Sequence, residues 1–126
     1  MIRFMRENFH GKTQEVVPEH LQREVDQIND SVLVVLNSLN EAAMYGGIPV
    51  PLEAETVMLS LKQIIKFWEK KLALYKEGNL PESVYRTRIE LSNMEVLFSG
   101  VDFLEAKEIV PSAMISQITE DVKRML

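Results

Sequence analysis

Apolar residues recur at alternating spacings of three and four along two long stretches of the chain. The first stretch carries Leu21, Val25, Ile28, Val32, Val35, Leu39 and Ala42. The second carries Ala54, Met58, Leu61, Ile65, Trp68, Leu72 and Tyr75. Such spacing places side chains on one face of an α-helix. The pattern predicts a helix over about residues 18–45, ended by Gly46 and Gly47, and a second from Pro51 to Gly78.

Two further helices are expected in the rest of the chain. The third begins near Pro81 and ends at Ser99 and Gly100, with Thr87 at a position where an apolar residue would fit better. Its expected inward residues are Val84, Leu91, Met94 and Phe98. Asp102 is expected to cap a short turn that runs to Glu108, and Pro111 opens a last helix.

The connectors are short, and no segment combines period-two alternation with turn residues, so no hairpin is predicted. Two prolines exclude a helix from residues 46–51. The fold class that follows is all-α: an antiparallel helical bundle of three long helices plus a shorter C-terminal helix. We expect residues 16–126 to form a single helical-bundle domain, preceded by residues 1–15 as a tail or docked segment.

The 3.5-residue period of the two long stripes favours shallow, coiled-coil-like packing. The same period serves packing inside one chain and packing between two chains. An intramolecular core is therefore one interpretation, and a homodimer that shares a helical seam is the other.

Composition narrows the class of protein. Of the 126 residues 46% are hydrophobic and 26% are charged, which is enough apolar material for one core without a metal or disulfide. The absence of cysteine excludes disulfides, thiolate nucleophiles and cysteine-ligated metals. The longest apolar run, Val32 to Leu36, is far too short to span a membrane, and charges interrupt the first residues where a signal peptide would need an apolar stretch. These features predict a cytoplasmic protein with no membrane span.

Candidate chemistry is sparse. His20 and Glu24 lie one helical turn apart, but no third ligand accompanies them, so no metal site is expected. The eight serines sit in neither a G-x-S-x-G nor an S-x-x-K pattern, and Gly46 and Gly47 lack the lysine of a phosphate loop. We expect no catalytic residues and no cofactor, and keep a small enzyme or metal-binding bundle as the third hypothesis.

A row of lysines supports a second hypothesis. Lys62, Lys66 and Lys70 lie four residues apart on one helical face, with Lys71 beside them. They make this face a candidate nucleic-acid site for an accessory or regulatory protein. The formal net charge of −5 argues against that partner, because nucleic-acid-binding domains are usually basic.

The leading hypothesis is a non-enzymatic protein-interaction or assembly module. Ile48 and Val50 alternate with prolines in a connector that should be exposed, and Met44 precedes it. Met5 and Phe9 share one face if the N-terminal segment is helical. These five residues are the candidate partner-binding residues, and another protein is the expected partner.

Overall fold

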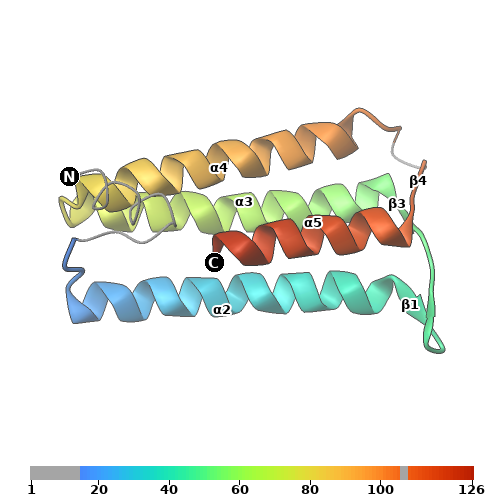
Figure 1. Ribbon diagram of the computed structural model, residues 1–126, viewed down its shortest axis with the longest axis horizontal. Coiled ribbons are helices and arrows are strands. Elements are labelled where there is room, and N and C mark those ends of the chain that lie inside the picture. Colours follow the sequence, from blue (N-terminus) through green and yellow to red (C-terminus); the bar gives the residue numbers. More distant parts are fainter. Residues whose placement is uncertain (1–14, 106–107) are drawn as a thin grey trace, which may run out of the picture.

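The computed structural model describes residues 15–105 and 108–126. In these residues four helices account for most of the chain: α2 (Glu19–Ala42), α3 (Ala54–Glu77), α4 (Pro81–Asp102) and α5 (Ser112–Met125). Figure 1 shows that each runs antiparallel to the one before it. The predicted fold class, an antiparallel bundle of three long helices plus a shorter C-terminal helix, is confirmed.

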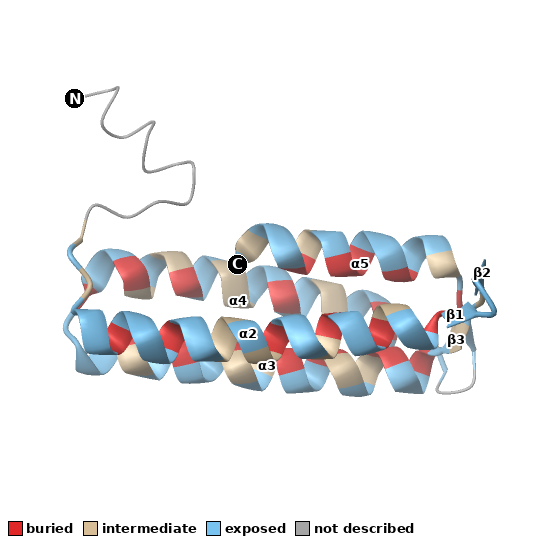
Figure 2. Cartoon of the chain, turned by 90° about the horizontal axis from the view of Figure 1, so that it is seen from below, coloured by how far each residue is buried: buried red, intermediate tan, exposed pale blue. Residues whose placement is uncertain are grey.

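Helix α3 lies in the middle of the bundle and contacts both α2 and α4. Helix α5 contacts α2 and α4 as well, and it follows only one half of their length (Figures 1 and 2). At the opposite end, the backbone N–H of Ser83 donates to the Glu15 carboxylate at 2.8 Å, which satisfies one of the free donors in the first turn of α4.

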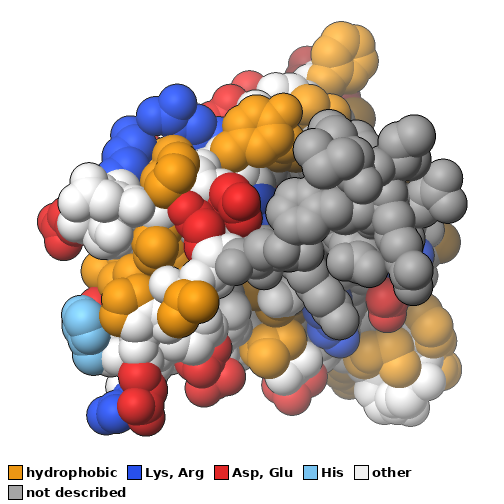
Figure 3. All heavy atoms as spheres, turned by 60° about the vertical axis from the view of Figure 1, so that its left-hand side comes forward, with side chains coloured by type: hydrophobic (Ala, Val, Ile, Leu, Met, Phe, Trp, Pro, Cys, Tyr) orange, Lys and Arg blue, Asp and Glu red, His pale blue; other side chains and the backbone are white. Residues whose placement is uncertain are grey.

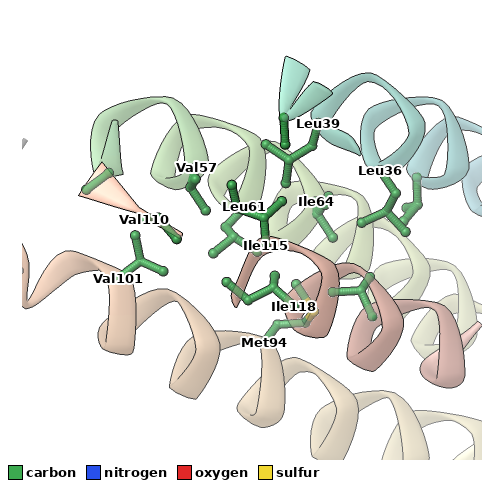
Figure 4. Packing of buried hydrophobic residues seen from close by; sticks show 14 of the residues in the cluster. Leu36, Leu39, Val57, Leu61, Ile64, Met94, Val101, Val110, Ile115 and Ile118 are labelled. Carbon is green, nitrogen blue, oxygen red and sulfur yellow. The ribbon is translucent and has the colours of Figure 1, made fainter. Parts of the chain in front are cut away.

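The main core fills the half of the bundle that α5 covers. Figure 4 shows side chains of α2, α3, α4 and α5, and of the strand before α5, pointing toward one another. Its fully buried members include Leu36, Leu61, Ile64, Met94 and Ile115. A smaller cluster beyond the end of α5 contains Leu21, Val25, Tyr75 and Leu80. Burial of these apolar faces is the main source of stability for helices of this length.

The inward face of α3 differs from the predicted one. The buried residues are Ala54, Val57, Leu61, Ile64, Trp68, Lys71 and Tyr75. The predicted stripe shares four of these but has Met58, Ile65 and Leu72 in place of Val57, Ile64 and Lys71. Both sets follow a 3.5-residue period. The predicted set, which placed Leu72 inward in preference to Lys71, is wrong at these three positions. Lys71 occupies a core position because polar partners from α2 and α4 surround it.

The apolar run from Val32 to Leu36 in α2 is not buried on all sides. Leu33 and Val34 instead lie on its outer face, and Val34 keeps 65% of its surface exposed. The reason is the place of α2 at the edge of the bundle, where the described helices α3 and α5 cover its inner side.

Two predictions about the end of helix α4 are also wrong. Helix α4 does not stop at Ser99 and Gly100 but continues to Asp102, because Val101 is buried in the core and its packing offsets the cost of a helical glycine. Asp102 is therefore the last residue of α4 and not the cap of a following turn.

The predicted absence of hairpins is wrong too. Strands β1 (Met44–Tyr45) and β2 (Ile48–Pro49) form a small antiparallel hairpin, and β3 (Leu52–Glu53) pairs with β4 (Ile109–Val110). All four strands lie at the same end of the bundle (Figure 2 shows three of them). The Ala54 N–H donates to the Glu108 carbonyl at 2.7 Å, which ties the start of α3 to the segment that leads into α5.

Candidate functional site

The candidate partner-binding residues separate into three groups in the structure. Ile48 and Met44 are exposed, with 65% and 45% of their surfaces accessible. Val50 is half-buried beneath the hairpin. Met5 and Phe9 fall outside the described residues. The exposed pair belongs to the β1–β2 hairpin, so this hairpin is the part of the candidate site that the structure defines.

The hairpin is held in shape by its two-residue turn. Gly46 and Gly47 have φ values of +57° and +81°, the left-handed conformation that a tight hairpin turn of this length requires at both central positions. Tyr45 pairs with Ile48 across the strands. The stem is closed by the Val50 N–H, which donates to the Ala43 carbonyl at 2.8 Å. The side chains at the tip are therefore presented on a rigid backbone.

We define the hairpin patch as Met44, Tyr45 and Ile48; Tyr45 and Ile48 form a cross-strand pair on one face of the hairpin, and Met44 pairs with Pro49 on the face that lines the adjacent groove. Tyr45 is 80% exposed and was not among the predicted site residues. Its partner across the turn, Ile48, was predicted from the prolines around it, but Tyr45 lies before the glycines in a stretch that was assigned to the end of a helix. The Gly-Gly pair was the available signal, since it is a strong marker of a hairpin turn as well as of a helix end.

A groove of about 480 Å³ adjoins the hairpin patch, between the end of α2 and the first turns of α5. One side is formed by the hairpin and α2, through Asn40, Ala43, Met44 and Pro49. The other side is formed by α5, through Ser112, Ala113, Ser116, Thr119, Glu120 and Lys123. The Thr119 hydroxyl oxygen lies 2.9 Å from the Ser116 backbone carbonyl oxygen and 3.3 Å from the side-chain Oδ1 of Asn40, and its single proton is donated to one of these two acceptors. The contact with Asn40 joins the two sides of the groove.

The groove and the patch together offer an apolar rim beside hydroxyl groups and two charges of opposite sign. Its size lies in the range of sites that accept a few side chains or a small molecule. Residues about 70 positions apart in the sequence form its two walls, and for this reason the contribution of α5 was not found from the sequence.

A second cluster of polar groups lies inside the bundle, where the main core meets the smaller one. Lys71 is only 4% exposed. Its Nζ donates to Asn29 Oδ1 of α2 at 2.9 Å and lies 3.8 Å from the centre of the Trp68 ring. The Trp68 Nε1–H in turn donates to Glu90 Oε1 of α4 at 3.1 Å. This polar layer, Asn29, Trp68, Lys71 and Glu90, links three helices.

Burial changes the acidity of this layer. Removal from water lowers the pKa of Lys71 from 10.5 to about 8, against the opposing attraction of the Glu90 carboxylate. Burial also raises the pKa of Glu90, while the Trp68 hydrogen bond and the charges of Lys71 and Arg86 act to lower it. Burial is again the largest cause of the raised pKa of Tyr75. Buried pairs of this kind stabilise one register of helices over others more than they add net stability.

The predicted lysine row is shorter than expected. Lys62, Lys66 and Lys70 are exposed on α3, but Lys71 points into the bundle, so its assignment to a solvated face is wrong. The Lys62 ammonium lies 5.8 Å from the Phe98 ring centre, and the Lys70 ammonium lies 5.6 Å from that of Phe67. The surface row therefore has three charges instead of four.

Within residues 15–105 and 108–126, no three His, Asp or Glu side chains gather closely enough to hold a metal ion. The helices found there are not long and apolar enough for any of them to cross a membrane.

Comparison of the chain with protein-family models, with curated proteins and with solved structures gives no match. The features of this chain that bear on its function are therefore an apolar hairpin beside a groove and a separate, largely buried polar layer.

Proposed function

We propose that this chain is a non-enzymatic protein-interaction or assembly module, and that its partner protein binds the hairpin patch and the groove beside it. The observation that carries the proposal is the exposure of three large apolar side chains, Met44, Tyr45 and Ile48, around a turn of fixed conformation. Exposed apolar side chains that gather in one place mark interaction surfaces in soluble proteins.

Rigidity supports this function as well as exposure. A hairpin whose turn and stem are already ordered loses little conformational entropy when a partner covers it. Tyr45 contributes an apolar ring with a polar hydroxyl, the type of side chain that contributes most at protein interfaces. The groove next to the patch has room for an anchoring side chain, and Glu120 and Lys123 on its α5 wall are placed to orient a polar segment of the partner.

The buried layer supports a structural role and not a chemical one. Lys71 and Glu90 have the shifted pKa values that are common at active sites, but Lys71 is closed to solvent and its ammonium is already bonded to Asn29. No pocket lies over it among those found in the described residues. A partner-binding function is favoured because its surface is accessible.

The test uses the tagged full-length chain as bait in lysate of the native host, with quantitative mass spectrometry of the retained proteins. The variant Ile48→Asp places a charge in the hairpin patch. The control Val34→Asp makes the same change at a helical position with the same exposure, 65%, on the outer face of α2. Thermal unfolding verifies that both variants fold.

We expect one protein to be retained stoichiometrically by the wild type and by the control, and to be reduced at least about tenfold by Ile48→Asp. Equal retention by Ile48→Asp contradicts the proposed surface. A nuclease-treated sample distinguishes this function from nucleic-acid binding. If the retained molecules are lost after nuclease treatment and binding falls steeply with salt, the partner is a nucleic acid and the binding surface is the lysine row.

A further inference from the structure

The outer face of α4 carries an apolar stripe that no other part of the described chain covers. Helix α4 packs on α3 through Ser83, Thr87, Met94 and Val101, which are buried. On the opposite face Tyr85, Ile89, Val96 and Phe103 are 70%, 46%, 70% and 88% exposed. Half of these buried positions are polar, while apolar side chains also lie on the outer face, so α4 lacks the single apolar face expected of a helix that packs only on its own chain.

The spacing of the stripe is that of a helical seam. Tyr85, Ile89, Ser92, Val96, Ser99 and Phe103 follow one another at intervals of 4, 3, 4, 3 and 4 residues. A repeat of 3.5 residues keeps one face of a helix turned toward a partner helix along its whole length. Helix α4 has 22 residues, about 33 Å at 1.5 Å per residue, which is three heptads of contact. In Figure 3 hydrophobic side chains gather at the top of the view, where α4 runs.

We propose that this α4 seam pairs with the α4 seam of a second copy of the chain, with the two helices antiparallel. The side-chain sizes support this occupant. When Val96 lies opposite Ser92 of the second copy, Ile89 lies opposite Ser99 of that copy. Each branched apolar side chain then faces a small one, which is how well-packed seams interdigitate.

The ends of the seam fit the same register. Tyr85 then lies opposite Phe103 of the second copy, and the two-fold axis repeats this aromatic pair at the other end. Offset or edge-to-face aromatic pairs add to the stability of such contacts.

The charged residues beside the seam favour an antiparallel direction of the two α4 helices. Arg88, Glu95 and Asp102 are exposed and lie seven residues apart, along one flank of the seam. In an antiparallel pair Arg88 approaches Asp102 of the second copy, and the symmetry gives two such pairs. In a parallel pair this flank of one copy lies on the opposite side of the seam from the same flank of the other, so Arg88 and Asp102 of the two copies do not meet. The single unfavourable contact is between the two copies of Glu95 near the axis, and it is outnumbered by the two favourable ones.

This seam is separate from the hairpin patch and does not depend on the proposed function. It also differs from the seams that the sequence pattern suggested for a dimer, because the stripes of α2 and α3 are used inside the chain.

The test is sedimentation equilibrium of the full-length chain over a wide concentration range. We expect a monomer–dimer equilibrium in which Val96→Asp raises the dimer Kd by about tenfold to a hundredfold. The control Val34→Asp changes another exposed valine, on α2, and leaves the Kd unchanged. A chain that stays monomeric at all concentrations, or a dimer that Val96→Asp does not weaken, overturns the proposal.

Orientation is tested by a charge exchange. Arg88→Glu alone weakens the dimer about fivefold or more, because two symmetric pairs are lost. The double variant Arg88→Glu with Asp102→Arg restores both pairs in an antiparallel dimer and returns the Kd close to that of the wild type. A double variant that is weaker than the single one overturns the antiparallel arrangement.

Discussion

Lys71 gives the sharpest prediction about the energetics of this fold, because its ammonium group is buried in the middle of the bundle. Replacing it by methionine keeps a long unbranched side chain over the Trp68 ring and removes the charge. The hydrogen bond from Lys71 Nζ to Asn29 Oδ1 is lost at the same time. The absolute change in stability mixes these effects, but its dependence on pH isolates the ionisation of Lys71.

The magnitude follows from the two pKa values. In the folded protein the pKa of Lys71 is about 8, and the ordinary value of 10.5 applies when the chain is unfolded. Below pH 8 both states hold the proton, and the buried charge costs roughly 3 kcal/mol at ~1.36 kcal/mol per pKa unit. Between pH 8 and 10.5 the unfolded state binds more protons, so the free energy of unfolding rises with pH. From pH 7 to pH 10 the expected gain is about 2–3 kcal/mol.

The pH window is chosen to exclude the other perturbed groups. The pKa of Glu90 is raised from 4.5, and that shift acts on the acid side. The pKa of Tyr75 is raised from 10.0, so its unfolded form ionises first above pH 10 and stability then falls. Between pH 7 and pH 10 Lys71 is therefore the group expected to dominate the slope.

The assay is urea unfolding at pH 7, 8, 9 and 10, followed by emission of Trp68, the single tryptophan, and by far-UV circular dichroism. The wild type and the control Lys66→Met, an exposed lysine of the same helix, should gain stability with pH in parallel. Lys71→Met should lack this gain of about 2–3 kcal/mol. If Lys71→Met keeps the same slope as the wild type, Lys71 is not buried as an ammonium and the reasoning fails.

Two smaller predictions concern the hairpin and the core. Gly47→Ala should lower the free energy of unfolding by about 1–2 kcal/mol in urea titrations, because a φ of +81° is unfavourable for a residue with a side chain, although the space around it is open. Gly47→Asn should lower it less, because asparagine tolerates this conformation better. Equal losses for the two variants would contradict the reasoning. Leu36→Ala should cost about 2–5 kcal/mol because the side chain is fully buried. Leu33→Ala, three residues earlier on the outer face of the same helix, should cost less than about 1 kcal/mol, and a similar loss at both sites would mean that α2 packs differently.

Several features of the fold could be predicted from the sequence because they depend on residues that are close along the chain. Pro81 and Pro111 mark the starts of α4 and α5 to within a residue, since proline fits the first turn of a helix. The periodic apolar residues of α2 and α3 identified two long helices, and their short connectors implied antiparallel neighbours. Of the candidate partner-binding residues, Ile48 was expected to be exposed because it stands in a connector with two prolines, and it is exposed.

Other features depend on partners far away in the sequence. At positions 57 and 58, and again at 64 and 65, both residues are apolar, so periodicity does not determine which of each pair faces inward. At positions 71 and 72 the hydrogen bond from Lys71 to Asn29, 42 residues earlier in the chain, holds the lysine on the inner face. This contact determines which face of α3 is buried. Thr87 was recognised as a polar residue on the inner face of α4. Glu90, three residues later, is half-buried because its carboxylate accepts a hydrogen bond from Trp68 of α3 and pairs with Arg86.

What the sequence alone determined is the number, approximate ends and direction of the helices, because caps, turn residues and hydrophobic period act within a few residues. Only the tertiary structure decided which apolar faces are left uncovered. The stripe of α4 and the hairpin patch are exposed because α3, α5 and the two strand pairs cover other surfaces. Hydrophobic burial has no direction of its own, so a local pattern specifies that a face is apolar, and the packing of the whole chain determines whether that face is buried or remains available to a partner.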